Sequence, residues 1–159
     1  MADNRDAAFS LVCDVFGFRN LNEHQINALK FVIEKKQDVF VNLPTGFGKS
    51  VVFQALPLVY SCLEPDRENN IVIVVSPLVS LMKDQVSLLL SRGISATCLN
   101  NDMSETDKRR VESGQCSIIY GSPESWLGDT RWRKMLTSQT YKNSVRVVAV
   151  DEAHVICHW

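Results

Sequence analysis

Several features that define common classes of protein are missing from this sequence. The five cysteines include no CxxC pair, which argues against a zinc site or a disulfide framework and favours a reducing compartment. Seventeen lysines and arginines balance eighteen acidic residues, so any contact with nucleic acid must come from local clusters. The first residues lack the layout of a signal peptide, and no apolar run is long enough to span a membrane. We therefore expect a soluble, intracellular protein with no membrane partner.

Internal repeats, low-complexity tracts and linkers are also absent, and 159 residues are enough for one domain. Apolar, β-branched segments instead alternate with helical patterns. The expected strands are residues 38–43, 71–76, 116–121 and 145–150, with a weaker one at 94–99. Their nearly continuous hydrophobicity is typical of parallel strands that are covered on both faces. The alternation predicts an α/β three-layer sandwich with a mainly parallel sheet.

Helix signals fill the gaps between the expected strands. Asn22 is a predicted N-cap with Gln25 three residues later, followed by a buried stripe of Ile26, Leu29 and Ile33. A second helix is expected to open at Ser76-Pro77 and end at Gly93, with Val79, Met82, Val86 and Leu89 on one face. Residues 104–113 predict a short charged helix capped by Ser104, and residues 51–60 a buried helix kinked near Pro57.

The segment LPTGFGKS, residues 43–50, is typical of a loop that binds nucleotide phosphates, although leucine replaces the usual first glycine. Backbone N–H groups and a helix N-terminus bind anions in such loops. Gly46 and Gly48 would allow close approach of the backbone, Lys49 would reach the β- and γ-phosphates, and the Ser50 hydroxyl would hold Mg²⁺. The alternative is a plain glycine-rich turn between a strand and a helix.

The second half of a nucleotide site is predicted at residues 145–154, where an apolar strand ends in two carboxylates. Ligands bind at this edge of open α/β sheets. Asp151 would hold Mg²⁺ through water, and Glu152 would orient the attacking water. A solvated acidic pair is the alternative, which the presence of Lys49 and Ser50 upstream disfavours. The pattern indicates a P-loop NTPase domain that uses ATP and Mg²⁺.

Six segments resemble, in order, the signatures of RecQ-family DNA helicases. They are FGFRNLNEHQ, LPTGFGKS, VVSPLVSLMKDQV, CLNN, YGSPE and DEAHVICHW. The resemblance runs from about Phe16 to the last residue. It implies that residues 16–159 form part of the first RecA-like, ATP-binding domain after an N-terminal helical segment at 1–15. The implied activity is ATP-dependent, 3′-to-5′ unwinding of DNA by a DEAH-type enzyme.

The same resemblance implies roles around the nucleotide. Gln25 would read the adenine edge through its amide, and Phe18 would stack on the base, a plain core role for Phe18 being left open. Asn22 stands where the family carries an arginine that packs on the base, so we expect weaker adenine selectivity. Thr45 belongs to the phosphate loop, and His154 would couple the nucleotide state to DNA.

Contacts with single-stranded DNA are also implied. The residues placed there are Ser76, Pro77, Ser80, Lys83, Ser122 and Trp159. The helix N-terminus and hydroxyl groups suit backbone phosphates, whereas Lys83 could equally lie on a solvated helix face. The basic clusters at 107–110 and 131–134 are interpreted first as exposed helix charge. A metal site at His154, Cys157 and His158 is weakly supported, because no second ligand cluster would complete it.

The sequence stops at the first aromatic residue of the family's aromatic-rich loop, without a second RecA-like domain. An arginine finger from that domain contributes roughly 10³–10⁵ in rate, and unwinding needs two moving domains. We therefore expect weak MgATP binding, negligible hydrolysis, and an aggregation-prone sheet edge. The alternatives are a non-catalytic nucleotide- or DNA-binding remnant and a DEAH-type RNA helicase. The resemblance implies a nuclear location if the source is a eukaryote.

Overall fold

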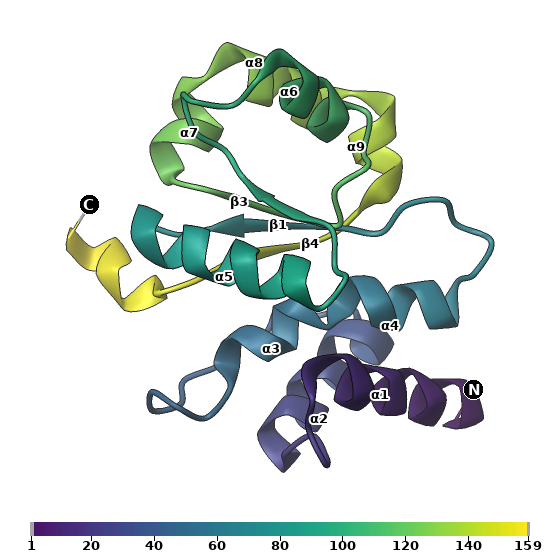
Figure 1. Ribbon diagram of the computed structural model, residues 1–159. Helices are drawn as coiled ribbons and strands as arrows, with labels where there is room; N and C mark the ends of the chain where they lie inside the picture. Colours follow the sequence, from purple (N-terminus) through teal and green to yellow (C-terminus); the bar gives the residue numbers. More distant parts are fainter. Residues whose placement is uncertain (1, 159) are drawn as a thin grey trace. The chain divides into compact units, whose positions relative to one another are not determined.

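A computed structural model describes residues 2–158, with side chains described from Asp3 to Val155. The chain forms two compact units, Met1–Asp66 and Arg67–Trp159. Their elements are labelled in Figure 1. No helix of the described residues is both long enough and apolar enough to cross a membrane.

In the first unit, all regular secondary structure of the described residues is helical. Its elements are α1 (Ala2–Phe16), α2 (Glu23–Lys30), the π-helix η1 (Phe31–Lys35), α3 (Lys49–Gln54) and α4 (Leu56–Leu63). Helix α1 packs on α4, and Val12 and Val59 are fully buried there. The helix expected over 51–60 is divided at Ala55, and Pro57 lies in the first turn of α4, where its missing N–H costs no hydrogen bond.

The strand predicted at residues 38–43 is wrong, because residues 36–44 form neither helix nor strand. Phe40 in this segment is 80% exposed. A strand needs a neighbour for its backbone N–H and C=O groups, and every strand of the described residues lies within 67–158. Hydrophobicity alone therefore did not make this segment a strand. Similarly, of the predicted stripe on α2 and η1 only Leu29 is buried, and Ile26 and Ile33 are half-buried.

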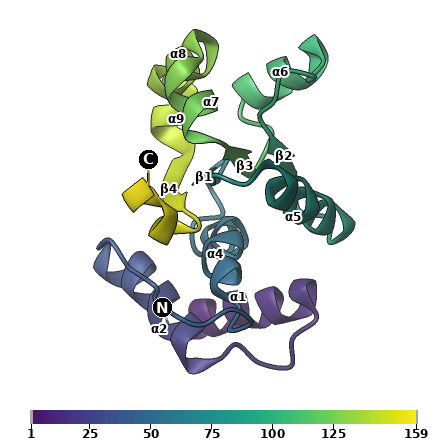
Figure 2. The ribbon, with the colours of Figure 1, turned by 90° about the vertical axis from the view of Figure 1, so that its left-hand side faces the viewer.

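The second unit is built on a parallel sheet, as predicted. Its strands are β1 (Ile71–Val75), β2 (Ala96–Cys98), β3 (Ile118–Gly121) and β4 (Val145–Val150). The 4-stranded sheet has the order β2-β3-β1-β4, and each neighbouring pair is parallel (Figure 2). The weaker strand signal at 94–99 gives the short β2. These four of the five expected strands are confirmed.

Helices cover both faces of this sheet. They are α5 (Val79–Ser91), α6 (Glu105–Glu112), α7 (Pro123–Gly128), α8 (Thr130–Thr137) and α9 (Gln139–Ser144), and the 3-10 helix η2 (Ala153–His158) follows β4. Helix α5 lies on one face, whereas α6 to α9 lie on the other (Figure 1). The three-layer α/β arrangement predicted from the sequence is thus present within this unit.

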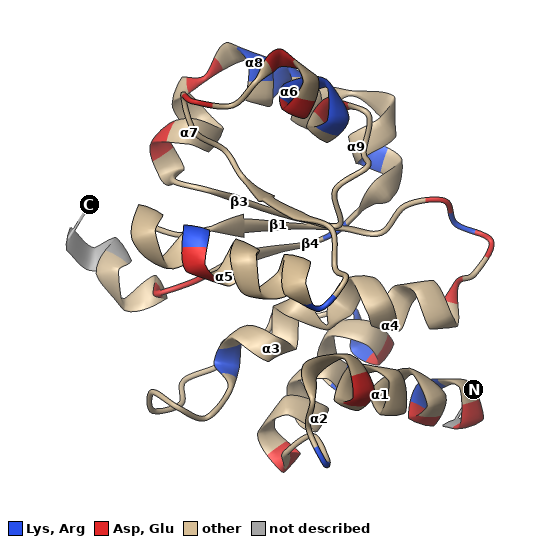
Figure 3. Cartoon of the chain, in the orientation of Figure 1, with Lys and Arg blue, Asp and Glu red and all other residues tan. Residues whose placement is uncertain are grey.

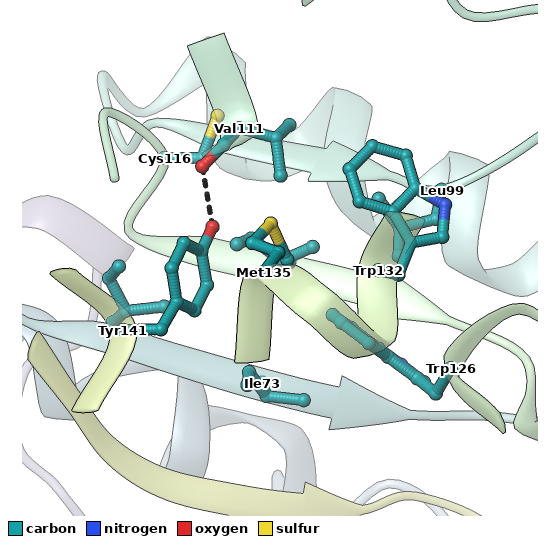
Figure 4. Packing of buried hydrophobic residues seen from close by; sticks show 10 residues of the cluster. Ile73, Leu99, Val111, Cys116, Trp126, Trp132, Met135 and Tyr141 are labelled. Atoms are coloured by element: carbon teal, nitrogen blue, oxygen red, sulfur yellow. Dashed lines mark hydrogen bonds between the residues drawn. The ribbon is translucent and has the colours of Figure 1, made fainter. Parts of the chain in front are cut away.

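An apolar core lies between the sheet and α6 to α9 (Figure 4). Ile73 of β1 and Ile119 of β3 face the aromatic side chains of Trp126, Trp132 and Tyr141. The buried Tyr141 hydroxyl donates a hydrogen bond of 2.5 Å to the backbone oxygen of Val111. Burial raises the pKa of this phenol, which therefore stays a neutral donor. On the opposite face, α5 contributes the buried Met82 and Leu89.

Of two predicted helices, one starts later than expected and the other has the expected cap. Helix α5 begins at Val79 with Leu78 as its N-cap, not at Ser76-Pro77, so Val79 is 48% exposed instead of lying in the buried face. Its end agrees with the prediction, because Gly93 adopts a left-handed φ of 76° directly after the C-cap. Helix α6 is capped by Ser104, whose Oγ accepts from the Asp107 amide, as predicted.

Candidate functional site

The predicted phosphate loop forms a turn that leads directly into α3. The Phe47 amide donates to the Pro44 carbonyl at 3.4 Å, and the Phe47 side chain is 48% exposed. Gly46 and Gly48 have φ angles of 91° and 71°, a left-handed conformation that other residues adopt only with strain. The loop and the helix of the predicted site are therefore present, without the preceding strand.

Side chains of this loop are placed at its mouth and at the start of α3. Lys49 is the first residue of α3, and its Nζ donates to the Leu43 carbonyl at 2.6 Å. An ammonium group has three donors, so this bond leaves others for a phosphate. Ser50 is half-buried in the first turn of α3, and Thr45 is exposed in the loop. These donors fit an anionic ligand.

The start of α2 contacts the same loop. Asn22 and Gln25 form the predicted capping box, in which Asn22 Oδ1 accepts from the Gln25 amide and Gln25 Oε1 accepts from the Asn22 amide, both at 2.9 Å. Gln25 Nε2 also donates to the Gly48 carbonyl at 3.1 Å, and Asn22 Nδ2 donates to the Phe47 carbonyl at 3.2 Å. The structure thus joins the residues predicted for the base to those predicted for the phosphates.

Phe18, the other residue predicted at the base, lies against a core side chain. Its ring stacks on Phe16 with centroids 6.0 Å apart and planes inclined by 19°. Phe16 is buried and Phe18 is half-buried. This contact agrees with the core role left open for Phe18, and its stacking on a base stays a prediction.

In the second unit, the acidic pair lies directly after β4. The Asp151 amide donates to the Val75 carbonyl at 2.9 Å, which continues the β1–β4 ladder by one residue. Asp151 Oδ1 accepts from the Glu152 amide at 3.0 Å, and Glu152 has a left-handed φ of 53°. Such a backbone conformation is costly for a residue other than glycine and is frequent at functional sites. The carboxylates therefore lie at the edge predicted for ligand binding.

His154 follows the acidic pair in the first residues of η2. Its Nδ1 lies 3.3 Å from Glu152 Oε2, and its side chain is 75% exposed. The pair carries opposite charges only when the histidine is protonated. Within the described residues no three His, Cys, Asp or Glu side chains gather as metal ligands. The side chains of Cys157 and His158, named in the weakly supported metal site, lie outside the described residues.

Three strand ends place predicted residues at one edge of the sheet. Val75 of β1 is aligned with Gly121 of β3 and with Val150 of β4. Ser76, Ser122 and Asp151 are the residues that follow these strands, so they occupy neighbouring positions. The sequence predicted these three separately, and the parallel register brings them together.

The side chains predicted at DNA differ in accessibility. Ser76 is 1% exposed, and its hydroxyl is buried without a hydrogen-bond partner. Ser122 Oγ caps α7 by accepting from the Ser125 amide at 3.1 Å. Ser80 and Lys83 are exposed on α5, and Pro77 is half-buried before it. Trp159 lies outside the described residues.

Two features near this edge were missed by the sequence analysis. The indole of Trp126 covers Gly121, and its Nε1 donates to the Val74 carbonyl at 3.2 Å. Beside Ser122 lies a polar cavity of about 700 Å³, whose lining includes Asn100 and Asn101 of the CLNN segment. The glycine and the tryptophan lie five positions apart with nothing in the local pattern to link them. The CLNN resemblance was the available signal for the cavity.

Arg131 joins α8 to α6. Its Nε and Nη2 donate to the two carboxylate oxygens of Glu112, both at 2.8 Å, and its Nη1 donates to Glu105 at 3.0 Å. These hydrogen bonds lower the pKa of both carboxyl groups. Helix α6 carries charges of both signs, whereas the charged residues of α8 are all basic (Figure 3). The arrangement agrees with the interpretation of residues 107–110 and 131–134 as exposed helix charge.

Comparison with known proteins defines the class of protein. Residues 22–159 match the DEAD/DEAH box helicase family, and the chain belongs to that family. It is similar to the ATP-dependent DNA helicase RecQ of Haemophilus influenzae, with 31% identity over 98% of this chain. It is also similar to RecQ of Bacillus subtilis, with 33% identity over 96% of the chain, and to the ATP-dependent helicase wrn-1 of Caenorhabditis elegans, with 34% over 96%. These similarities confirm the resemblance to RecQ helicases.

The chain spans only a part of each relative. It covers 23% of the Haemophilus protein, 24% of the Bacillus protein and 13% of the Caenorhabditis protein.

Proposed function

We propose that this chain provides the nucleotide-binding part of an ATP-dependent DNA helicase of the RecQ type. The observation that carries the proposal is the phosphate loop, in which two left-handed glycines lead into α3 at Lys49. This geometry exposes backbone donors to an anion, and a lysine ammonium lies beside them. The family match adds support, because it includes both this loop and the acidic pair after β4.

The proposed roles follow from the donors and acceptors of each residue. Lys49 binds the β- and γ-phosphates, and Ser50 and Asp151 hold Mg²⁺ with oxygen ligands, which this ion prefers. Bound Mg²⁺ supplies charge neutralisation at the phosphates. Glu152 orients the attacking water, and His154, whose Nδ1 lies 3.3 Å from Glu152 Oε2, couples the nucleotide state to DNA.

DNA is the proposed partner, at the edge where β1, β3 and β4 end. Ser80 and Lys83 are exposed there on α5, and the Ser122 cap presents the amino end of α7. Phosphate contacts of this kind position a strand without reading its sequence. Unwinding requires motion between two domains and so belongs to a full-length helicase. A nuclear location is part of the proposal only for a eukaryotic source.

Binding of MgATP tests the proposal. Titration of the chain with a fluorescent ATP analogue should give saturable binding, and Lys49→Ala should weaken it by about tenfold or more, since charge-assisted hydrogen bonds are strong. Lys35→Ala removes an exposed lysine from the same unit and should bind like the unsubstituted chain. Equal affinity of Lys49→Ala and the unsubstituted chain would contradict the proposed phosphate site.

A further inference from the structure

Two side chains at the start of α2 hold consecutive carbonyl groups of the phosphate loop. Asn22 Nδ2 binds the Phe47 oxygen at 3.2 Å, and Gln25 Nε2 binds the Gly48 oxygen at 3.1 Å. The reciprocal bonds of the capping box fix Asn22 and Gln25 relative to each other. Two hydrogen bonds therefore connect the start of α2 with the loop, and two more hold the Asn22 and Gln25 side chains in place.

The effect on the loop follows from the geometry of the peptide bond. A trans peptide is planar, and its N–H points opposite to its C=O. The Phe47 carbonyl shares a peptide with the Gly48 amide, and the Gly48 carbonyl shares one with the Lys49 amide. No peptide bond here is cis. Because α2 holds both carbonyls, the N–H groups of Gly48 and Lys49 point away from α2, as donors available to an anion.

The contact leaves little room for variation. A Cβ atom on Gly48 would lie 2.4 Å from Gln25 Nε2, and the φ of 71° disfavours other residues at this position. Gln25 is buried, so its amide is held in place by the surrounding side chains as well. The positive φ and the nearby Gln25 amide thus both favour glycine before the lysine.

We propose that Asn22 is a positioning residue for phosphate binding, acting through the Phe47 carbonyl and not through the nucleotide base. The inference rests on the proposed function of the loop. Asn22 stands where the resemblance to RecQ helicases implies an arginine, and the role proposed here for the asparagine does not involve the base. In this chain the asparagine orients the donors of the phosphate loop, an effect that is the same whichever base the nucleotide carries.

A contact with the base and a contact with the loop predict different effects of Asn22→Arg on nucleotide affinity. If Asn22 only lacked a contact with the base, Asn22→Arg would strengthen ATP binding selectively. An arginine, however, has no oxygen to accept from the Gln25 amide, and its longer side chain does not place a donor where Asn22 Nδ2 lies. Asn22→Arg should therefore weaken the binding of every nucleotide.

The test uses Asn22→Ser, which keeps a capping oxygen but cannot reach the Phe47 carbonyl. Affinities are measured for MgATP, MgGTP and magnesium tripolyphosphate, the last of which has no base. We expect all three to weaken by a similar factor of about two to ten, the effect of one neutral hydrogen bond. The control Asn20→Ser changes an exposed asparagine two residues earlier and should leave the affinities unchanged.

Two outcomes would overturn the proposal. A loss confined to MgATP would mean that Asn22 acts on the base, and unchanged affinities would mean that the bond to Phe47 orients nothing. Amide hydrogen exchange across residues 44–50 gives a measurement without nucleotide, and Asn22→Ser should speed it. If the unsubstituted chain binds none of the three ligands, the proposed function fails. The role of Asn22 in positioning the loop is then judged by exchange alone, and unchanged exchange rejects it.

Discussion

Residues 38–43 and the strand Ile71–Val75 have similar local sequences and opposite structures. DVFVNL and IVIVV are both short, apolar and rich in β-branched residues. The second is a central strand in which Val72 and Val74 are fully buried, whereas the first forms no strand and its Phe40 is 80% exposed. A propensity for extended structure is thus common to both segments and does not distinguish them.

The two segments differ in whether neighbouring strands are available to pair with them. Strand β1 has β3 on one side and β4 on the other, so its backbone groups have partners in two ladders. Residues 38–43 lie in the helical unit, where the described residues include no strand to pair with. An apolar run becomes a strand when a ladder partner and a covering layer are both available. The comparison therefore separates what a sequence favours from what a fold permits.

The largest expected effect comes from shortening one apolar side chain in each segment. Ile73→Ala should lower the free energy of unfolding by about 2–5 kcal/mol, because it opens a cavity beside the buried aromatic side chains. Phe40→Ala should change it by less than about 0.5 kcal/mol, since its ring is mostly in water. Urea unfolding followed by circular dichroism measures both.

An equal loss in the free energy of unfolding for Phe40→Ala and Ile73→Ala would contradict this expectation. Residues 38–43 would then be buried in solution, and the strand prediction from the sequence would be restored. A small cost for both substitutions would instead mean that the core around Ile73 is loosely packed.

The sequence was most informative where a pattern is local. Continuous apolar runs predicted four strands, and the caps at Asn22 and Ser104 were found because a capping residue and its partner lie three positions apart. Likewise, an acidic pair after an apolar strand was enough to place Asp151 and Glu152 at the carboxyl edge of the sheet, where ligand binding is proposed.

The parts that were missed depend on contacts between distant positions. Asn22 and the Phe47 carbonyl are 25 residues apart, and Trp126 and the Val74 carbonyl are 52 apart. A bond from a side chain to a backbone oxygen leaves no mark on the residue that accepts, since every residue has that oxygen. The roles of Asn22 and Trp126 could therefore be recognised only once the fold had brought them to their partners.

A second, smaller effect tests how closely the edge of the sheet is packed. Gly121→Ala places a Cβ 2.5 Å from the Trp126 Nε1, and the buried indole has little room to move. We expect a loss of about 1–3 kcal/mol in the free energy of unfolding. Gly128→Ala is the matched control, because nothing lies within 4 Å of its added Cβ. Equal stability of the two variants would show that the Trp126 indole does not pack closely against Gly121.

The smallest expected effect concerns the charges that join α6 to α8. Arg131→Met removes the partner of Glu105 and Glu112 and should lower the melting temperature by roughly 2–5 °C at pH 7.

Since Arg131 lowers the pKa of both carboxyl groups in the folded chain, its contribution is complete above their ordinary pKa of about 4.3 and is lost as the pH falls through the lowered values. The difference between the two proteins should therefore shrink as the pH falls below about 4.3. Arg133→Met, at an exposed position of the same helix, is the control. A difference that persists in acid would assign the role of Arg131 to its packing on Trp132, over which the guanidinium lies at 5.7 Å.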